Sequence, residues 1–162
     1  MKNTFFLLLA TFLGFYSCKK TETTDKTTVH PETSQFSIDS VAVSDSVKIV
    51  DSLTLKYTGK MLVFPSLKEK QLLDSIYFFA PKLTDFTKTG IQNYLNGEKT
   101  AFFDSVKKEN NDWISDVKFA QHWYTNSEMK LVSQENDFMH IRYFGSSYMG
   151  GAHDNYFFNE RV

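Results

Sequence analysis

Between residues 36 and 64, hydrophobic and polar side chains alternate along the chain. Most odd positions from 41 to 57 carry valine, isoleucine, leucine or tyrosine, and most even positions from 48 to 58 carry lysine, serine or threonine. A period of two is typical of strands that bury one face. Asp45 and Asp51 interrupt the apolar positions, so we expect turns or bulges there that divide the run into shorter strands. Gly59-Lys60 predicts a further turn.

The pattern changes to a helical one between residues 66 and 108. Ser66 and Glu69 have the spacing of a capping box, and the helix that they predict ends before Pro81. A second helix is expected over residues 83–95, ended by Asn96-Gly97, and a third over residues 100–108.

The last 45 or so residues again alternate as strands do. Turns are expected at 125–127 and 135–137, and strands over 138–144 and from Tyr156 to Val162. The expected fold is α+β: two or three helices packed on an antiparallel β-sheet, a meander that includes a C-terminal Tyr-x-Gly-Gly-Ala-His turn. No turn or cap follows the last strand, so we expect the chain to be a fragment of a longer protein.

Composition limits the class of protein. The chain has 162 residues, of which 41% are hydrophobic, and the 16 phenylalanines supply enough apolar surface for the core of one domain. The formal net charge is −1, which argues against a nucleic-acid-binding protein, because such proteins usually carry a basic face.

The N-terminus has the features of an export signal. Lys2 precedes an apolar run from Phe5 to Phe15 that is too short to span a bilayer. Ser17 and Cys18 follow it in the arrangement of a lipobox, and Cys18 is the single cysteine of the chain. We therefore expect residues 1–17 to be a lipoprotein signal peptide and Cys18 to be acylated. Residues 18–35 are rich in threonine, lysine and glutamate and predict a flexible tether. The folded domain then covers residues 36–162.

The loop before the last strand carries the most distinctive motif. Its residues are Tyr148, Gly150, Gly151, Ala152 and His153, and the two glycines suit backbone with positive φ. The motif, in its β-rich context, resembles the extracytoplasmic domain of the peptidoglycan deacetylase PdaC and the anti-sigma factor RsiV. The resemblance covers roughly Val47 to Val162. It implies an envelope-facing binding domain, which in that family is usually followed by an RsiV-type C-terminal domain, and we expect this chain to lack that second domain. The deacetylase activity of that family belongs to a separate domain.

Three histidines are the candidate metal ligands. His122, His140 and His153 lie on successive segments expected to be β-structure. With Asp154 they could form a zinc site, because imidazole and carboxylate suit that ion. Their spacings match no short metal motif, so isolated histidines are the favoured interpretation. For the glycine loop, we expect a structural role in which His153 holds the loop through a hydrogen bond. No nucleophile elbow accompanies it.

These observations favour a membrane-anchored envelope lipoprotein with a non-catalytic binding domain, exported to the periplasmic or cell-surface side. The expected ligand is a cell-wall glycan or a lysozyme-like protein, and neither a cofactor nor nucleic acid is expected. Tyrosines and tryptophans are numerous enough for a sugar-stacking surface. Two alternatives remain: a hydrolase or deacetylase that acts on peptidoglycan through a histidine-bound metal, and an inactive fragment of a longer envelope protein.

Overall fold

The computed structural model describes residues 37–109, 114, 118–135 and 138–162. The expected signal peptide, the acylation site Cys18 and the tether of residues 18–35 lie outside the described residues. The same holds for two of the three residues of the turn expected at 135–137.

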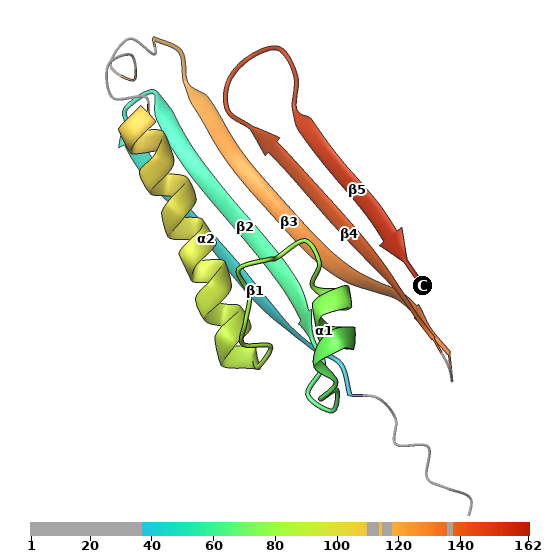
Figure 1. The fold of residues 1–162 in the computed structure, drawn as a ribbon. Helices are drawn as coiled ribbons and strands as arrows, with labels where there is room; N and C mark the ends of the chain where they lie inside the picture. Colours follow the sequence, from blue (N-terminus) through green and yellow to red (C-terminus); the bar gives the residue numbers. More distant parts are fainter. Residues whose placement is uncertain (1–36, 110–113, 115–117, 136–137) are drawn as a thin grey trace, which may run out of the picture. The chain divides into compact units, whose positions relative to one another are not determined.

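Five strands form one mixed sheet (Figure 1). The strands are β1 (Asp39–Val50), β2 (Leu53–Val63), β3 (Gln121–Gln134), β4 (Met139–Tyr148) and β5 (Asn155–Arg161), and they lie side by side in chain order. Neighbouring strands are antiparallel except β2 and β3, which are parallel. The prediction of an antiparallel meander was therefore wrong at this junction. The segment between β2 and β3 contains both helices, and a parallel pair needs such a long crossover.

Several expected turns lie inside strands instead. β1 continues through Asp45, which pairs with Tyr57 of β2, and the chain reverses only at Asp51 and Ser52. Gly59-Lys60 lies within β2, and Thr125-Asn126-Ser127 lies within β3. These residues favour turns locally, but each extends a ladder of hydrogen bonds with the neighbouring strand, and the tertiary context outweighs the local preference.

The described residues between β2 and β3 form two helices. α1 (Lys70–Ile76) begins after Glu69, which makes no side-chain capping bond, so the predicted capping box was wrong. α2 (Lys88–Glu109) joins the two helices that had been expected over 83–95 and 100–108. Asn96-Gly97 does not end it. Ile91, Leu95 and Val106 on either side of that pair are fully buried, and their packing outweighs the roughly 1 kcal/mol that glycine costs within a helix.

The core lies between the helices and one face of the sheet. α2 packs on β1 and β2, and both helices lie in front of the sheet in Figure 1. Most buried side chains of the strands are odd-numbered residues such as Leu53, Leu55 and Met129, and Leu62 near the end of β2 is an exception. The buried tyrosine hydroxyls have acceptors: Tyr77 donates to the Leu62 carbonyl at 2.7 Å and Tyr143 to the Ile76 carbonyl at 2.9 Å. No described helix covers the other face of the sheet.

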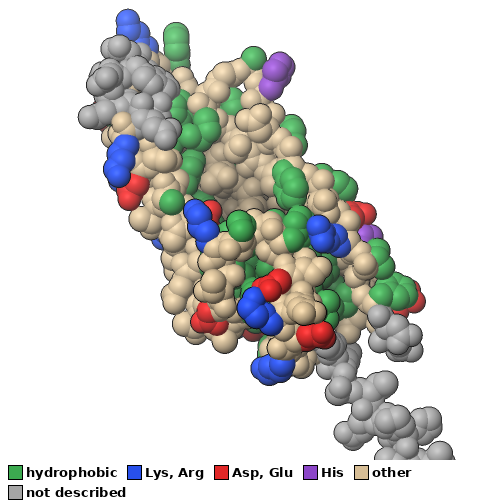
Figure 2. All heavy atoms as spheres, viewed as in Figure 1, with side chains coloured by type: hydrophobic (Ala, Val, Ile, Leu, Met, Phe, Trp, Pro, Cys, Tyr) green, Lys and Arg blue, Asp and Glu red, His purple; other side chains and the backbone are tan. Residues whose placement is uncertain are grey.

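The helix-bearing side shows acidic, basic and hydrophobic side chains interspersed, with no large area of one charge (Figure 2). Neither helix in the described ranges combines the length and hydrophobicity that crossing a bilayer requires.

Candidate functional site

The candidate site is the face of the sheet that the helices leave open. Side chains alternate across a strand, so the even-numbered residues of β1, β2 and β3 point to this face. The strand register places Ser46 beside Lys56 and Lys56 beside Tyr124. One step along, Ser44, Thr58, Asn126 and Ser146 form a second row across four strands.

This face is hollowed. The hollow has a volume of about 920 Å³, within the range of roughly 300–1,000 Å³ that is usual for ligand pockets. We call it the hydroxyl hollow, because serine, threonine and tyrosine supply most of its polar groups. Its lining residues are Ser44, Asp45, Ser46, Thr54, Lys56, Thr58, His122, Tyr124, Thr125, Asn126 and Ser146. Such a surface offers many hydrogen-bond donors and acceptors and little charge.

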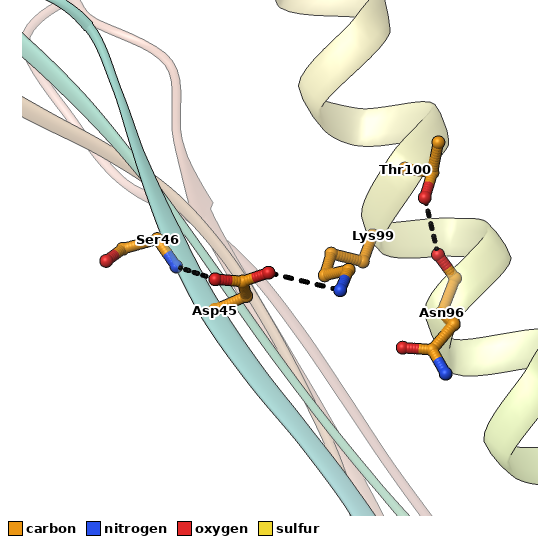
Figure 3. Close-up of polar contacts among 5 residues, drawn as sticks. All are labelled: Asp45, Ser46, Asn96, Lys99 and Thr100. Carbon is orange, nitrogen blue, oxygen red and sulfur yellow. Dashed lines mark hydrogen bonds and ion pairs between the residues drawn. The ribbon is translucent and has the colours of Figure 1, made fainter.

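Asp45 is the one carboxylate in this lining, and it is engaged elsewhere (Figure 3). Its Oδ2 accepts a hydrogen bond from the Lys99 ammonium of α2 at 3.1 Å, and its Oδ1 accepts one from the Ser46 amide at 2.8 Å. Both bonds lower the pKa of the Asp45 carboxyl, and the bond from Lys99 has the larger effect. Asp45 is therefore ionised and directed toward the helix.

Aromatic side chains flank the hydroxyl hollow on the β4 and β5 side. Asp154 accepts hydrogen bonds from the hydroxyls of Tyr124, at 2.7 Å, and Tyr156, at 3.3 Å. The bond to Asp154 raises the pKa of Tyr124, and the negative charge of Asp154 raises the pKa of Tyr156. The Tyr148 ring lies 6.4 Å from that of Tyr124, centroid to centroid. Together Tyr124, Tyr148 and Tyr156 form an aromatic border, which Asp154 links through the hydroxyls of Tyr124 and Tyr156.

The β4–β5 loop, residues 149–154, contains most of the motif that the sequence singled out. Gly150 and Gly151 have φ of 83° and 113°, and Gly150 lies so close to Trp123 that an added Cβ would be 3.1 Å from the indole ring. The Tyr148 hydroxyl donates to the Gly151 carbonyl at 3.0 Å. Ala152 and His153 are exposed. The hydrogen bonds that the structure describes for the loop come from Tyr148 and Asp154, and the role of His153 in holding the loop stays a prediction.

The structure does not bring the three candidate metal ligands together. His122 is exposed in the hydroxyl hollow, and His153 lies in the β4–β5 loop. His140 lies toward the opposite end of β4, where its Nε2 is 3.2 Å from Glu160. Within the part of the chain that the structure describes, no three histidine, cysteine, aspartate or glutamate side chains form a group that could hold a metal ion.

The sequence did not reveal most residues of the hydroxyl hollow. The polar positions of the alternating segment were visible in the sequence, and they include Ser44, Thr54, Lys56 and Thr58. The parallel pairing that places this face beside Asn126 could not be predicted from the sequence. Asp154 was also missed as the acceptor of two tyrosine hydroxyls. Among the aromatic residues considered for a sugar-stacking surface, Trp123 and Tyr143 are buried, whereas Tyr124 and Tyr148 are half-buried and Tyr156 is exposed.

The chain is similar in fold to solved DUF3298 family structures. A member of that family from Bacteroides fragilis superposes with a TM-score of 0.57 at 16% identity, over 78% of this chain and 55% of that protein. A DUF3298 family protein from Pseudomonas aeruginosa has a TM-score of 0.41 at 12% identity, over 77% of this chain and 50% of that protein. The chain thus spans about half the length of these structures. No protein-family model matches the chain, and no curated protein does.

Proposed function

We propose that the protein is a membrane-anchored lipoprotein of the cell envelope whose folded domain binds cell-wall glycan in the hydroxyl hollow without catalysing a reaction. The observation that carries the proposal is the hollow itself, with its hydroxyl and amide lining and its border of Tyr124, Tyr148 and Tyr156. Sugars present closely spaced hydroxyls at their edges and apolar C–H groups on their faces. Side chains of this kind match both, through hydrogen bonds and through stacking on aromatic rings.

The N-terminal sequence supports the envelope location. Lys2, the apolar run from Phe5 to Phe15 and the lipobox-like Ser17-Cys18 are the features of an exported and acylated protein. A tether of residues 18–35 would hold the domain a short distance from the membrane, within reach of the cell wall.

The C-terminal motif supports a relationship with the PdaC/RsiV extracytoplasmic domain. In this proposal the turn from Tyr148 to His153 serves to fix the aromatic border. Tyr148 bonds the Gly151 carbonyl, and Asp154, one residue after the motif, accepts the Tyr124 hydroxyl.

Co-sedimentation with purified peptidoglycan sacculi tests the proposal. The full-length protein should pellet with sacculi. Ser44→Trp, which fills the hydroxyl hollow from an exposed strand position that tolerates aromatic residues, should reduce the pelleted fraction several-fold. Ser40→Trp is the matched control, because Ser40 is exposed on the same face of the same strand and outside the lining. It should pellet as the wild type does.

Two outcomes would overturn the proposal. Equal pelleting of both tryptophan variants would place binding elsewhere on the molecule. Absence of pelleting, together with binding to lysozyme in the same buffer, would identify a protein ligand in place of the glycan.

A further inference from the structure

Lys56 lies in the middle of the hydroxyl hollow. It is exposed on β2, with Ser46 of β1 on one side and Tyr124 of β3 on the other. Thr54 and Thr58 precede and follow it on the same face of β2, and both line the hollow. A ligand that spans the hollow must therefore pass the Lys56 ammonium.

The charge of Lys56 is not balanced by any described residue. The neighbouring cations on this face have partners: Lys48 pairs with Asp51 at 2.8 Å and Lys60 with Glu128 at 3.5 Å. Lys56 forms no ion pair or hydrogen bond with a residue in the described ranges. The nearby carboxylates are engaged, since Asp45 is bonded to Lys99 on the helix side and Asp154 to two tyrosine hydroxyls.

The geometry points to a glycan that carries an anionic group on its sugar units, with Lys56 binding that group and the hydroxyls around it binding the sugar. This inference rests on the proposed function and names its ligand more closely. An ammonium gains most from an ionised acceptor, because charge-assisted hydrogen bonds are roughly twice as strong as neutral ones. The flexible lysine side chain acts as a point charge, so both carboxylate and phosphate groups fit.

The test compares three saccharides of one length. Chitotetraose is neutral, the alternating tetrasaccharide of N-acetylglucosamine and N-acetylmuramic acid adds carboxylates, and chemically phosphorylated chitotetraose adds phosphate. Each is titrated by calorimetry into the full-length wild type, Lys56→Gln and Lys130→Gln. Lys130 is the matched control, because it is exposed on the same face, is not paired with a described residue, and lies roughly 20 Å along β3 from Tyr124.

The wild type should bind at least one anionic tetrasaccharide roughly three- to tenfold more tightly than chitotetraose, the range expected for one charge pair that is partly open to water. Lys56→Gln should remove this preference, and Lys130→Gln should retain it. The preferred anion, carboxylate or phosphate, identifies the source of the group.

Other results would overturn the inference in distinguishable ways. Equal binding of neutral and anionic sugars by the wild type would reject the anionic ligand and leave the proposed glycan binding standing. A preference that both lysine variants reduce equally would show general attraction by surface charge. Failure to bind any of the three sugars, or sacculi, would reject the proposed function as well.

Discussion

Gly150 and Trp123 form the contact that fixes the β4–β5 loop at the border of the hydroxyl hollow. Gly150 has a φ of 83°, and an added Cβ would lie 3.1 Å from the indole ring, a tight contact that requires the ring to shift slightly. Gly151 also has positive φ, but no atom lies within 4 Å of the position that a Cβ would occupy. The sequence identified both glycines as positions of unusual backbone. It could not show which of them packs against the core.

Substitution of Gly150 should therefore cost more than substitution of Gly151. Gly151→Ala should lower the free energy of unfolding by roughly 1–3 kcal/mol through backbone strain alone. Gly150→Ala should lower it further, since the new methyl group also meets Trp123. Urea denaturation of both variants checks this, with exposed Ala152→Ser as a control. Unchanged midpoints in both glycine variants would show that the loop does not need positive φ.

The buried tyrosines make the stability depend on alkaline pH. Burial raises the pKa of Tyr57 and of Tyr143 to about 12, above the value of about 10 in the unfolded chain. Because the pKa is higher in the folded state, the folded protein keeps these tyrosine protons at pH values at which the unfolded chain has lost them. Stability is then fully present below pH 10 and falls as the pH rises from about 10 to 12.

Tyr143→Phe should make this decline shallower by roughly 1.4 kcal/mol per pH unit within that window. It should also lower stability at neutral pH, by about 1 kcal/mol, because the bond from the Tyr143 hydroxyl to the Ile76 carbonyl is lost. Urea midpoints between pH 8 and 11.5 measure both effects. An unaltered slope above pH 10 would show that Tyr143 does not titrate as its burial predicts.

At the scale of the elements, α2 approaches β2 closely at Gly59. A Cβ on Gly59 would lie 2.9 Å from Leu95 Cδ2 and 2.7 Å from the Tyr57 hydroxyl oxygen. This residue had predicted a turn, and its actual role is to let a helix approach a strand. Gly97 lies on the exposed side of α2, and no atom lies within 4 Å of the position that an added Cβ would occupy. Gly97 is therefore not needed for a close approach between elements.

The two glycines should consequently respond to alanine in opposite directions. Gly59→Ala should destabilise the protein by roughly 1–3 kcal/mol through overpacking. Gly97→Ala should stabilise it by roughly 0.4–1 kcal/mol, because alanine loses less backbone entropy in a helix. Thermal or urea unfolding of the pair compares them directly. Stabilisation by Gly59→Ala would mean that α2 does not approach β2 as described.

The elements also show how far the sequence could predict the fold. Alternation from 41 to 57 correctly identified the buried faces of β1 and β2, because burial on one face imposes a period of two. The breaks predicted at Asn96-Gly97 and Thr125-Asn126-Ser127 were wrong. A local turn preference of about 1 kcal/mol is outweighed there by packing and by the hydrogen bonds between strands. The parallel pairing of β2 with β3 depends on contacts between residues far apart in the chain, and no local pattern encodes it.

At the scale of the whole molecule, the described helices pack on one face of the sheet, and we propose that the other face binds the ligand. The strands supply this face with hydroxyls and with the border tyrosines Tyr124, Tyr148 and Tyr156, and the β4–β5 loop adds their acceptor Asp154. The expected position of the protein at the membrane depends on a separate feature, the cysteine that follows the apolar N-terminal run.

Cys18→Ala should abolish acylation and release the protein from the membrane or leave it unprocessed. Labelled palmitate incorporation, followed by fractionation of the cells, measures both consequences. Cys18 is the chain's only cysteine, so no disulfide within the chain is disturbed. Label that persists in the alanine variant would contradict the lipoprotein assignment.

Amide chemical-shift mapping of the protein with a soluble peptidoglycan fragment tests glycan binding in the hydroxyl hollow most directly. The shifts should change along the centre of the open sheet face, at Thr54, Lys56, Thr58 and Asn126, and at Asp154 beside it. Ile91 and Leu95 on α2 should be unaffected. Changes confined to the helices or to the outer edge of β5, or no changes at saturating fragment, would contradict glycan binding in the hydroxyl hollow.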